Sequence, residues 1–172
     1  MSGRTSSRRA RPSFDDVPDA RRRNMAAISG RDTKPERTLR RILHSLGYRF
    51  RLHRRDLPGR PDIVLPGRRK VIFINGCFWH RHGCRNSVLP RARREWWEAK
   101  LSRNVERDIA NVAALKAQDW SVLTVWECEM DNAARLSKII QSFLGPPGSL
   151  AAQAVLSRKA KSRRVANRGN RQ

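Results

Sequence analysis

The sequence predicts an α/β fold in which helices flank a mixed central sheet. Two continuously apolar segments, residues 71–74 and Ser121–Trp126, have the length and the branched residues of strands that are covered on both faces. Segments with apolar residues at helical spacing lie before, between and after them. Because 172 residues suffice for one core and not for two, we expect one folded domain.

The first helix is predicted over residues 33–47. Thr33 and Glu36 form the T-x-x-E capping pattern, and Gly47 provides the stop. The apolar stripe between them consists of Leu39, Ile42, Leu43 and Leu46. An edge strand is expected next, over residues 48–52.

A hairpin is predicted at the centre of the sheet. A turn rich in Pro and Gly, residues 57–61, leads into an apolar strand over residues 62–65. Residues 66–69 form the next turn, and residues 71–74 form the second strand. Residues 75–90 begin with Asn-Gly, so we expect a loop there.

Two further helices complete the predicted domain. One covers residues 92–118, either unbroken or interrupted near Ser102, and the other covers residues 132–144 after the strand Ser121–Trp126. The first is expected to bury Val105, Ile109, Val112 and Leu115. The second is expected to bury Leu136, Ile139, Ile140 and Phe143.

The chain is strongly basic, and the charge is not confined to its ends. The formal net charge is +23, and residues 24–156 alone hold 24 Lys and Arg against 12 acidic residues. We predict disordered basic segments over residues 1–20 and 145–172 and a folded domain over residues 21–144. Such a charge favours binding to nucleic acid through the release of counterions.

No apolar run approaches the roughly 20 residues that span a bilayer, and the N-terminus lacks the hydrophobic stretch of a signal peptide. We therefore expect a cytoplasmic, nucleoid-associated protein. Thiols stay reduced in that compartment, so disulfides are not expected.

Three cysteines and a histidine have the composition of a zinc site. Cys77, His82, Cys84 and Cys128 supply three thiolates and one imidazole, the ligand set of a closed tetrahedral site. The spacing is not that of a standard knuckle, and it is equally compatible with three unconnected thiols. His80 is an alternative ligand to His82.

Several motifs together resemble the very short patch repair (Vsr-type) endonucleases over about residues 21–144. They are RDT with Glu36 (31–36), LPGRPD (57–62), GCFWH (76–80), Lys100, NVERD (104–108) and VWEC (125–128). The resemblance implies a fold related to type II restriction endonucleases. It also implies Mg²⁺-dependent nicking of one DNA strand beside the thymine of a T·G mismatch, which arises when 5-methylcytosine deaminates.

The resemblance also assigns roles to the catalytic residues. Asp62 binds Mg²⁺, the main-chain carbonyl of Ile74 is a second ligand, and Glu36 reaches the ion through water. His80 takes a proton from the attacking water and Asp108 orients its ring. From the residues alone, Asp62 is also compatible with turn or cap hydrogen bonds, the capping pattern already accounts for Glu36, and Asp108 fits a solvated helical face. Asn75 stands where the best-known members carry a second histidine, and an amide donates hydrogen bonds but shuttles no proton at neutral pH.

Mismatch recognition is assigned to aromatic wedges. By resemblance, Phe78, Trp79 and Trp97 enter the DNA from one groove, and Met25 approaches from the other side. From the residues alone, Trp96 and Trp97 are both candidates for the core, and Met25 is equally an anchor for the N-terminal segment. Adjacent aromatic residues in an extended loop cannot both be buried, so we expect Phe78 or Trp79 to protrude.

The expected partners are a T·G-mismatched duplex, helper proteins of mismatch repair and, functionally, a cytosine-5 DNA methyltransferase. A monomer suffices for one nick. Two other functions fit the sequence less completely. They are an inactive, zinc-stabilised DNA-binding protein, suggested by Asn75, and a restriction-type nuclease on matched DNA.

Overall fold

The computed structural model describes residue 23 and residues 32–148 of the chain. The chain divides into two units, Met1–Thr33 and Lys34–Gln172, and the second contains the helices and strands described here. Three predicted features lie outside the described residues. They are the arm over residues 1–20, Met25, and the part of the tail beyond residue 148. No helix in the described part has the length and apolar composition needed to cross a membrane.

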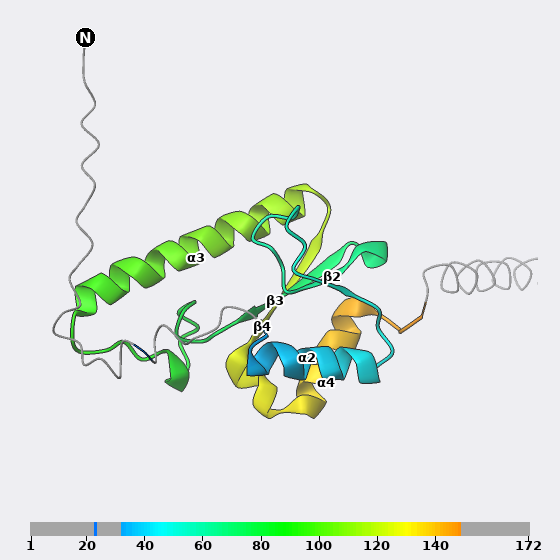
Figure 1. The fold of residues 1–172 in the computed structure, drawn as a ribbon, viewed down its shortest axis with the longest axis horizontal. Coiled ribbons are helices and arrows are strands. Elements are labelled where there is room, and N and C mark those ends of the chain that lie inside the picture. The colour runs from blue at the N-terminus through cyan, green and yellow to red at the C-terminus, as the bar shows by residue number, and fades with distance from the viewer. Residues whose placement is uncertain (1–22, 24–31, 149–172) are drawn as a thin grey trace, which may run out of the picture. The chain divides into compact units, whose positions relative to one another are not determined.

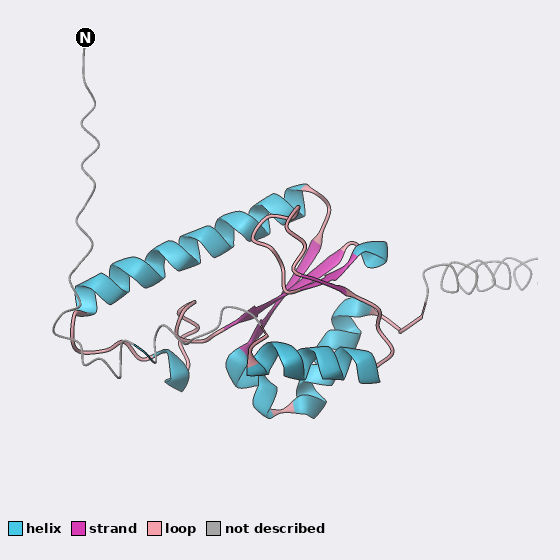
Figure 2. Cartoon of the chain, viewed as in Figure 1, coloured by secondary structure: helices cyan, strands magenta, loops and turns pink. Residues whose placement is uncertain are grey.

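A four-stranded mixed sheet, ordered β1-β2-β3-β4, forms the centre of the fold (Figure 2). Its strands are β1 (Arg51–Leu52), β2 (Ile63–Leu65), β3 (Lys70–Asn75) and β4 (Ser121–Trp126). β1, β2 and β3 are antiparallel neighbours, whereas β3 and β4 run parallel. The predicted central hairpin is therefore confirmed.

The helices of the described residues, α2 (Lys34–Ser45), α3 (Arg94–Ala117) and α4 (Ala133–Leu144), cover the two faces of this sheet (Figure 1). The long α3 lies on one face, and α2 and α4 lie on the other. α2 begins directly after Thr33, and Gly47 follows its end with φ +80°, a conformation that favours glycine. The predicted mixed α/β class is confirmed.

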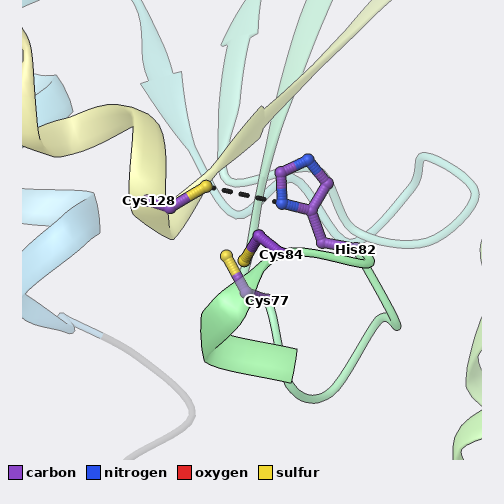
Figure 3. Close-up of side chains that lie close together, drawn as sticks. All are labelled: Cys77, His82, Cys84 and Cys128. Carbon is purple, nitrogen blue, oxygen red and sulfur yellow. Dashed lines mark hydrogen bonds between the residues drawn. The ribbon is translucent and has the colours of Figure 1, made fainter. Parts of the chain in front are cut away.

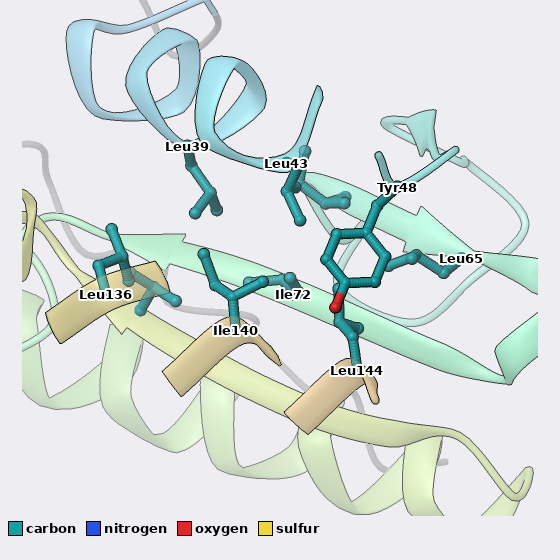
Figure 4. Close-up of a cluster of buried hydrophobic side chains, with 10 residues drawn as sticks. Leu39, Leu43, Tyr48, Leu65, Ile72, Leu136, Ile140 and Leu144 are labelled. Atoms are coloured by element: carbon teal, nitrogen blue, oxygen red, sulfur yellow. The ribbon is translucent and has the colours of Figure 1, made fainter. Parts of the chain in front are cut away.

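The core is divided by the sheet, because alternate residues of a strand face opposite sides. Ile72 packs with Leu39 and Leu43 of α2 and Ile140 of α4 (Figure 4). Its neighbour Val71 belongs to the other cluster, with Leu57, Val64, Leu115 and Trp120. The strands are thus covered on both faces, as their continuous apolar sequence predicts.

Two details of the sequence prediction are wrong. The expected edge strand over residues 48–52 is reduced to β1, because the Tyr48 N–H still donates to Leu43 O at 2.9 Å in the turn that closes α2. In α3, which is unbroken at Ser102, Leu115 is buried but Ile109 is 65% exposed. The predicted stripe residues other than Leu115 line a hollow on the helix face and do not join the core; these residues are Val105, Ile109 and Val112.

Candidate functional site

The parallel pairing of β3 and β4 brings two cysteines together. Asn75 at the end of β3 lies opposite Trp126 at the end of β4. Cys77 and Cys128 each follow two residues later, so both leave the sheet at the same edge. Cys128 lies in a 3-10 turn, Glu127–Asp131, and the Glu129 carboxylate accepts a hydrogen bond from the Trp126 N–H at 2.8 Å.

The loop after β3 carries the other members of this cluster. Its His82 and Cys84 side chains meet those of Cys77 and Cys128 (Figure 3), and the four candidate ligand atoms all lie within 4.8 Å of one another. His82 Nδ1 is 3.4 Å from Cys128 Sγ. His80, the alternative ligand, points elsewhere. The cluster therefore has the donor set and the spacing of a metal site.

Electrostatics also favours a cation in the Cys/His cluster. Burial raises the pKa of the Cys77 thiol to about 12. Burial acts in the same direction on Cys84, but hydrogen bonds from the Asn86 backbone, His82 and the other thiols outweigh it and lower the pKa of Cys84 to about 7. Packed thiols cannot all ionise beside one another without a positive charge, so the residues fit a thiolate-binding metal.

A tryptophan holds the ring of His82. The His82 and Trp126 rings are stacked, with centroids 4.1 Å apart and planes 10° from parallel (Figure 3 shows His82). Because Trp126 ends β4, this stacking fixes the orientation of the imidazole relative to the sheet and leaves Nδ1 facing the cysteines. The orientation of His82 is thus set by the fold.

The antiparallel pairing of β2 and β3 places Asp62 at the same end of β3. Ile63 lies opposite Ile72, so Asp62 just before β2 reaches the last residues of β3. The Ile74 N–H donates a hydrogen bond to Asp62 Oδ2 at 2.8 Å. Burial raises the pKa of the Asp62 carboxyl to about 6, against the opposing effect of this hydrogen bond and with a further rise from Glu36.

Glu36 comes from α2 to meet this carboxylate. It is 4% exposed, and its Oε2 accepts a hydrogen bond from Arg40 at 2.7 Å. Between Glu36 and Asp62 lies His53, with Nε2 3.6 Å from Glu36 Oε2 and Nδ1 4.0 Å from Asp62 Oδ1. No sequence pattern points to His53, because a single histidine in a loop carries none; only its place beside two acidic residues in space identifies it.

His80 and Asp108 form a second polar pair beside the end of β3. His80 Nδ1 is hydrogen-bonded to Asp108 Oδ2, and about a quarter of each side chain is exposed. The His80 N–H donates to Gly76 O at 3.2 Å, which fixes the turn directly after Asn75. Asn75, His80 and Asp108 line a hollow of about 540 Å³ whose apolar wall is the α3 stripe noted above.

Aromatic rings gather next to this pair. The Phe78 ring lies 5.2 Å from both Trp79 and Trp97, centroid to centroid, and Trp79 lies 6.1 Å from Trp97. Asn104 Nδ2 donates to Trp79 O at 3.1 Å and ties the loop to α3. Phe78 and Trp79 are both partly exposed, as are Trp96 and Trp97.

Comparisons with known proteins agree on a family. Residues 15–86 match the family model described as DNA mismatch endonuclease Vsr. A type II nicking enzyme of Xanthomonas oryzae, V.XorIIP, is 48% identical over 129 residues, which cover 75% of this chain and 95% of that enzyme. The DNA mismatch endonuclease Vsr of Escherichia coli is 44% identical over 117 residues, covering 68% of this chain and 75% of the relative.

A third relative, the type II nicking enzyme V.NmeAIP of Neisseria meningitidis, is 38% identical over 123 residues, covering 69% of this chain and 88% of that enzyme. All three relatives are matched over at least three quarters of their length. Two of them are nicking enzymes and the third is a mismatch endonuclease. The chain is a DNA endonuclease, and it belongs to the Vsr family of DNA mismatch endonucleases.

Proposed function

We propose that this endonuclease uses Mg²⁺ to cut one strand of DNA beside the thymine of a T·G mismatch. One observation carries the proposal: the Asp62 carboxylate and the His80–Asp108 pair lie at the same end of β3, joined through Ile74 and Asn75. Phosphodiester hydrolysis requires neutralisation of phosphate charge and an activated water. An acidic site and an imidazole at adjacent positions can supply both.

The acidic residues fit a hard divalent cation. Asp62 and Glu36 are largely buried side chains, and the pKa of Asp62 is raised to about 6 chiefly by burial, with a further rise from the nearby Glu36. Mg²⁺ prefers carboxylate and carbonyl oxygens. When bound, it would neutralise charge on the scissile phosphate.

The backbone at Ile74 can supply a further oxygen. The N–H and C=O of one strand residue point to the same side, and the Ile74 N–H points toward Asp62. Continuing the β2–β3 register places Pro61 opposite Ile74, and proline has no N–H to donate to that carbonyl. These two facts support the Ile74 carbonyl as the second ligand.

His80 is proposed as the general base. Its Nδ1 is engaged by Asp108, so Nε2 of the neutral ring is left with a lone pair that accepts a proton from water. Asp108 then stabilises the charged ring. Asn75, in the same hollow, contributes hydrogen bonding to phosphate and no proton transfer.

The aromatic cluster is proposed to recognise the mismatch. Phe78, Trp79 and Trp97 are partly exposed, and Phe78 packs edge to face against both tryptophans, so the rings support one another. Insertion between base steps costs a few kcal/mol of unstacking, and this cost is lower at a weakly stacked mismatch. Met25 is proposed to contact the DNA from the opposite side.

The Cys/His cluster is proposed to bind Zn²⁺ and to hold the loop that carries Phe78, Trp79 and His80. Its four ligands come from that loop and from the turn after β4, so the ion would connect the two. Bound zinc contributes roughly 10 kcal/mol or more to the folded state of such sites.

The biological partners follow from the mismatch. T·G pairs from deaminated 5-methylcytosine arise where a cytosine-5 methyltransferase acts, so we propose that the chain works beside such an enzyme, as a monomer on cytoplasmic DNA. The names of two relatives as nicking enzymes support cleavage of one strand.

End-labelled duplexes test the proposal. The strand containing the mismatched thymine is labelled in one sample and the complementary strand in another, and matched duplexes serve as controls. We expect a single nick in the thymine strand of the T·G duplex that requires Mg²⁺. Cleavage of both strands, or equal cleavage of matched DNA, would contradict the proposed specificity, and binding without any cleavage would indicate a DNA-binding protein.

A further inference from the structure

His53 lies at the proposed magnesium site but has no role in the chemistry described above. It follows β1 in a loop, with φ +45°, and its side chain is 24% exposed. Its two ring nitrogens face different groups. Nε2 faces Arg40 and Glu36, and Nδ1 faces Asp62.

Arg40 determines which nitrogen of His53 carries the proton. The Arg40 Nη2 lies 3.1 Å from His53 Nε2, and a guanidinium can only donate hydrogen bonds. Nε2 must therefore accept, which leaves the proton of the neutral ring on Nδ1. The same Arg40 nitrogen donates to Glu36 at 2.7 Å, so its position is fixed by two acceptors.

The Nδ1–H so defined faces the Asp62 carboxylate. The distance to Oδ1 is 4.0 Å, an electrostatic contact that is longer than a hydrogen bond. The other oxygen, Oδ2, is held by the Ile74 N–H at 2.8 Å. Asp62 thus has one oxygen held by a backbone N–H and the other near the protonated nitrogen of His53.

We propose that His53 is a positioning residue, whose Nδ1–H, fixed by Arg40, orients the Asp62 carboxylate for the divalent cation. This inference rests on the proposed magnesium site. In this proposal His53 is not itself a ligand, because its Nε2 lone pair accepts from Arg40 and its Nδ1, which faces Asp62, carries a proton. Partners that orient ligating groups in this way typically change metal affinity by about 10- to 100-fold when they are removed.

The tautomer is tested on the unaltered full chain. In ¹⁵N-labelled, metal-free protein, the two ring nitrogens of a neutral histidine have well-separated chemical shifts, and the His53→Gln spectrum assigns the signals. We expect protonated Nδ1 and unprotonated Nε2. A ring protonated on Nε2 alone would overturn the proposal, because its Nδ1 would then direct a lone pair at Asp62.

Calorimetric titration with Mn²⁺, which shares the oxygen preference of Mg²⁺, tests the positioning role. His53→Leu should bind Mn²⁺ about tenfold or more weakly than the native chain. His53→Gln retains a donor and an acceptor and should stay close to native. His44→Leu, at an exposed histidine of α2, is the matched control.

The other outcomes separate this inference from the function it rests on. Native affinity in His53→Leu would overturn the positioning role, and equal weakening in His53→Leu and His53→Gln would overturn it in favour of direct ligation by the imidazole. Native affinity in Asp62→Asn would instead contradict the proposed magnesium site. If His53→Leu does not give a native-like melting transition, the tautomer measurement decides.

Discussion

The Ile74 N–H donates a hydrogen bond to Asp62 Oδ2 at 2.8 Å, joining the start of β2 to the end of β3. This contact fixes a carboxylate at the edge of the sheet from which the loop with His80 departs. At the same end of β3, the register of β3 and β4 brings Cys77 beside Cys128. One sheet edge therefore organises the acidic site, the imidazole and the Cys/His cluster.

Asp62→Asn should abolish measurable Mg²⁺ binding and nicking, because an amide oxygen has no net charge for the cation. DNA affinity should stay within severalfold of native, since the chain is strongly basic elsewhere. Asp56→Asn, at an exposed carboxylate paired with Arg54, is the control and should behave as native. Calorimetry measures Mg²⁺ binding, and gel assays measure nicking and DNA affinity. Loss of nicking with intact Mg²⁺ binding would show that Asp62 is not a ligand of the metal.

Mg²⁺ affinity should depend on pH through Asp62. Its pKa is raised to about 6, mainly by burial, so the carboxyl is ionised above that pH and gains a proton as the pH falls through it. Since the metal binds the ionised form, affinity should be constant at higher pH and fall about tenfold per pH unit below 6. Titrations between pH 5 and 8 measure this; a decline that begins only near pH 4 would show that burial does not raise the pKa.

Phe78→Ala and Trp79→Ala should lose the preference for T·G over matched DNA more than they lose general DNA affinity. The rings support one another, so either truncation weakens the whole wedge. Val88→Ala, at a residue of the same loop that is 74% exposed, is the control. Competition binding with both duplexes gives the preference, and equal losses on both would argue against a wedge.

Purified protein should contain one Zn²⁺ per chain by metal analysis, and Cys77→Ser or Cys128→Ser should lower both zinc content and melting temperature. The four ligand atoms share one small volume, so removing one weakens the whole site. A native-like, active chain that contains no zinc would refute the assignment.

Much of the fold follows from local sequence signals. Gly47 ends α2 where the pattern places the stop, and the apolar segments before and after the turn at residues 66–69 form the central hairpin. The stripe of α3 was misjudged because periodicity identifies an apolar face but not what covers it. Ile109 borders an open hollow, and only the three-dimensional structure shows this.

The candidate site was less predictable than the fold. Motifs and resemblance selected Asp62, His80 and the cysteines, but their meeting depends on strand register, which no local pattern specifies. His53 had no signal at all, because its meaning comes from Arg40, Glu36 and Asp62 around it. Long-range contacts of this kind become visible only when the chain is folded.

The most direct test of the account is the single-turnover nicking rate of a T·G duplex at saturating Mg²⁺ by native chain, His80→Ala, Asp62→Asn and the double variant. If the imidazole and the carboxylate act in one step, each single variant should lose most of the rate and the double variant should be little slower than either. A His80→Ala rate close to native, with unchanged DNA binding, would contradict the account.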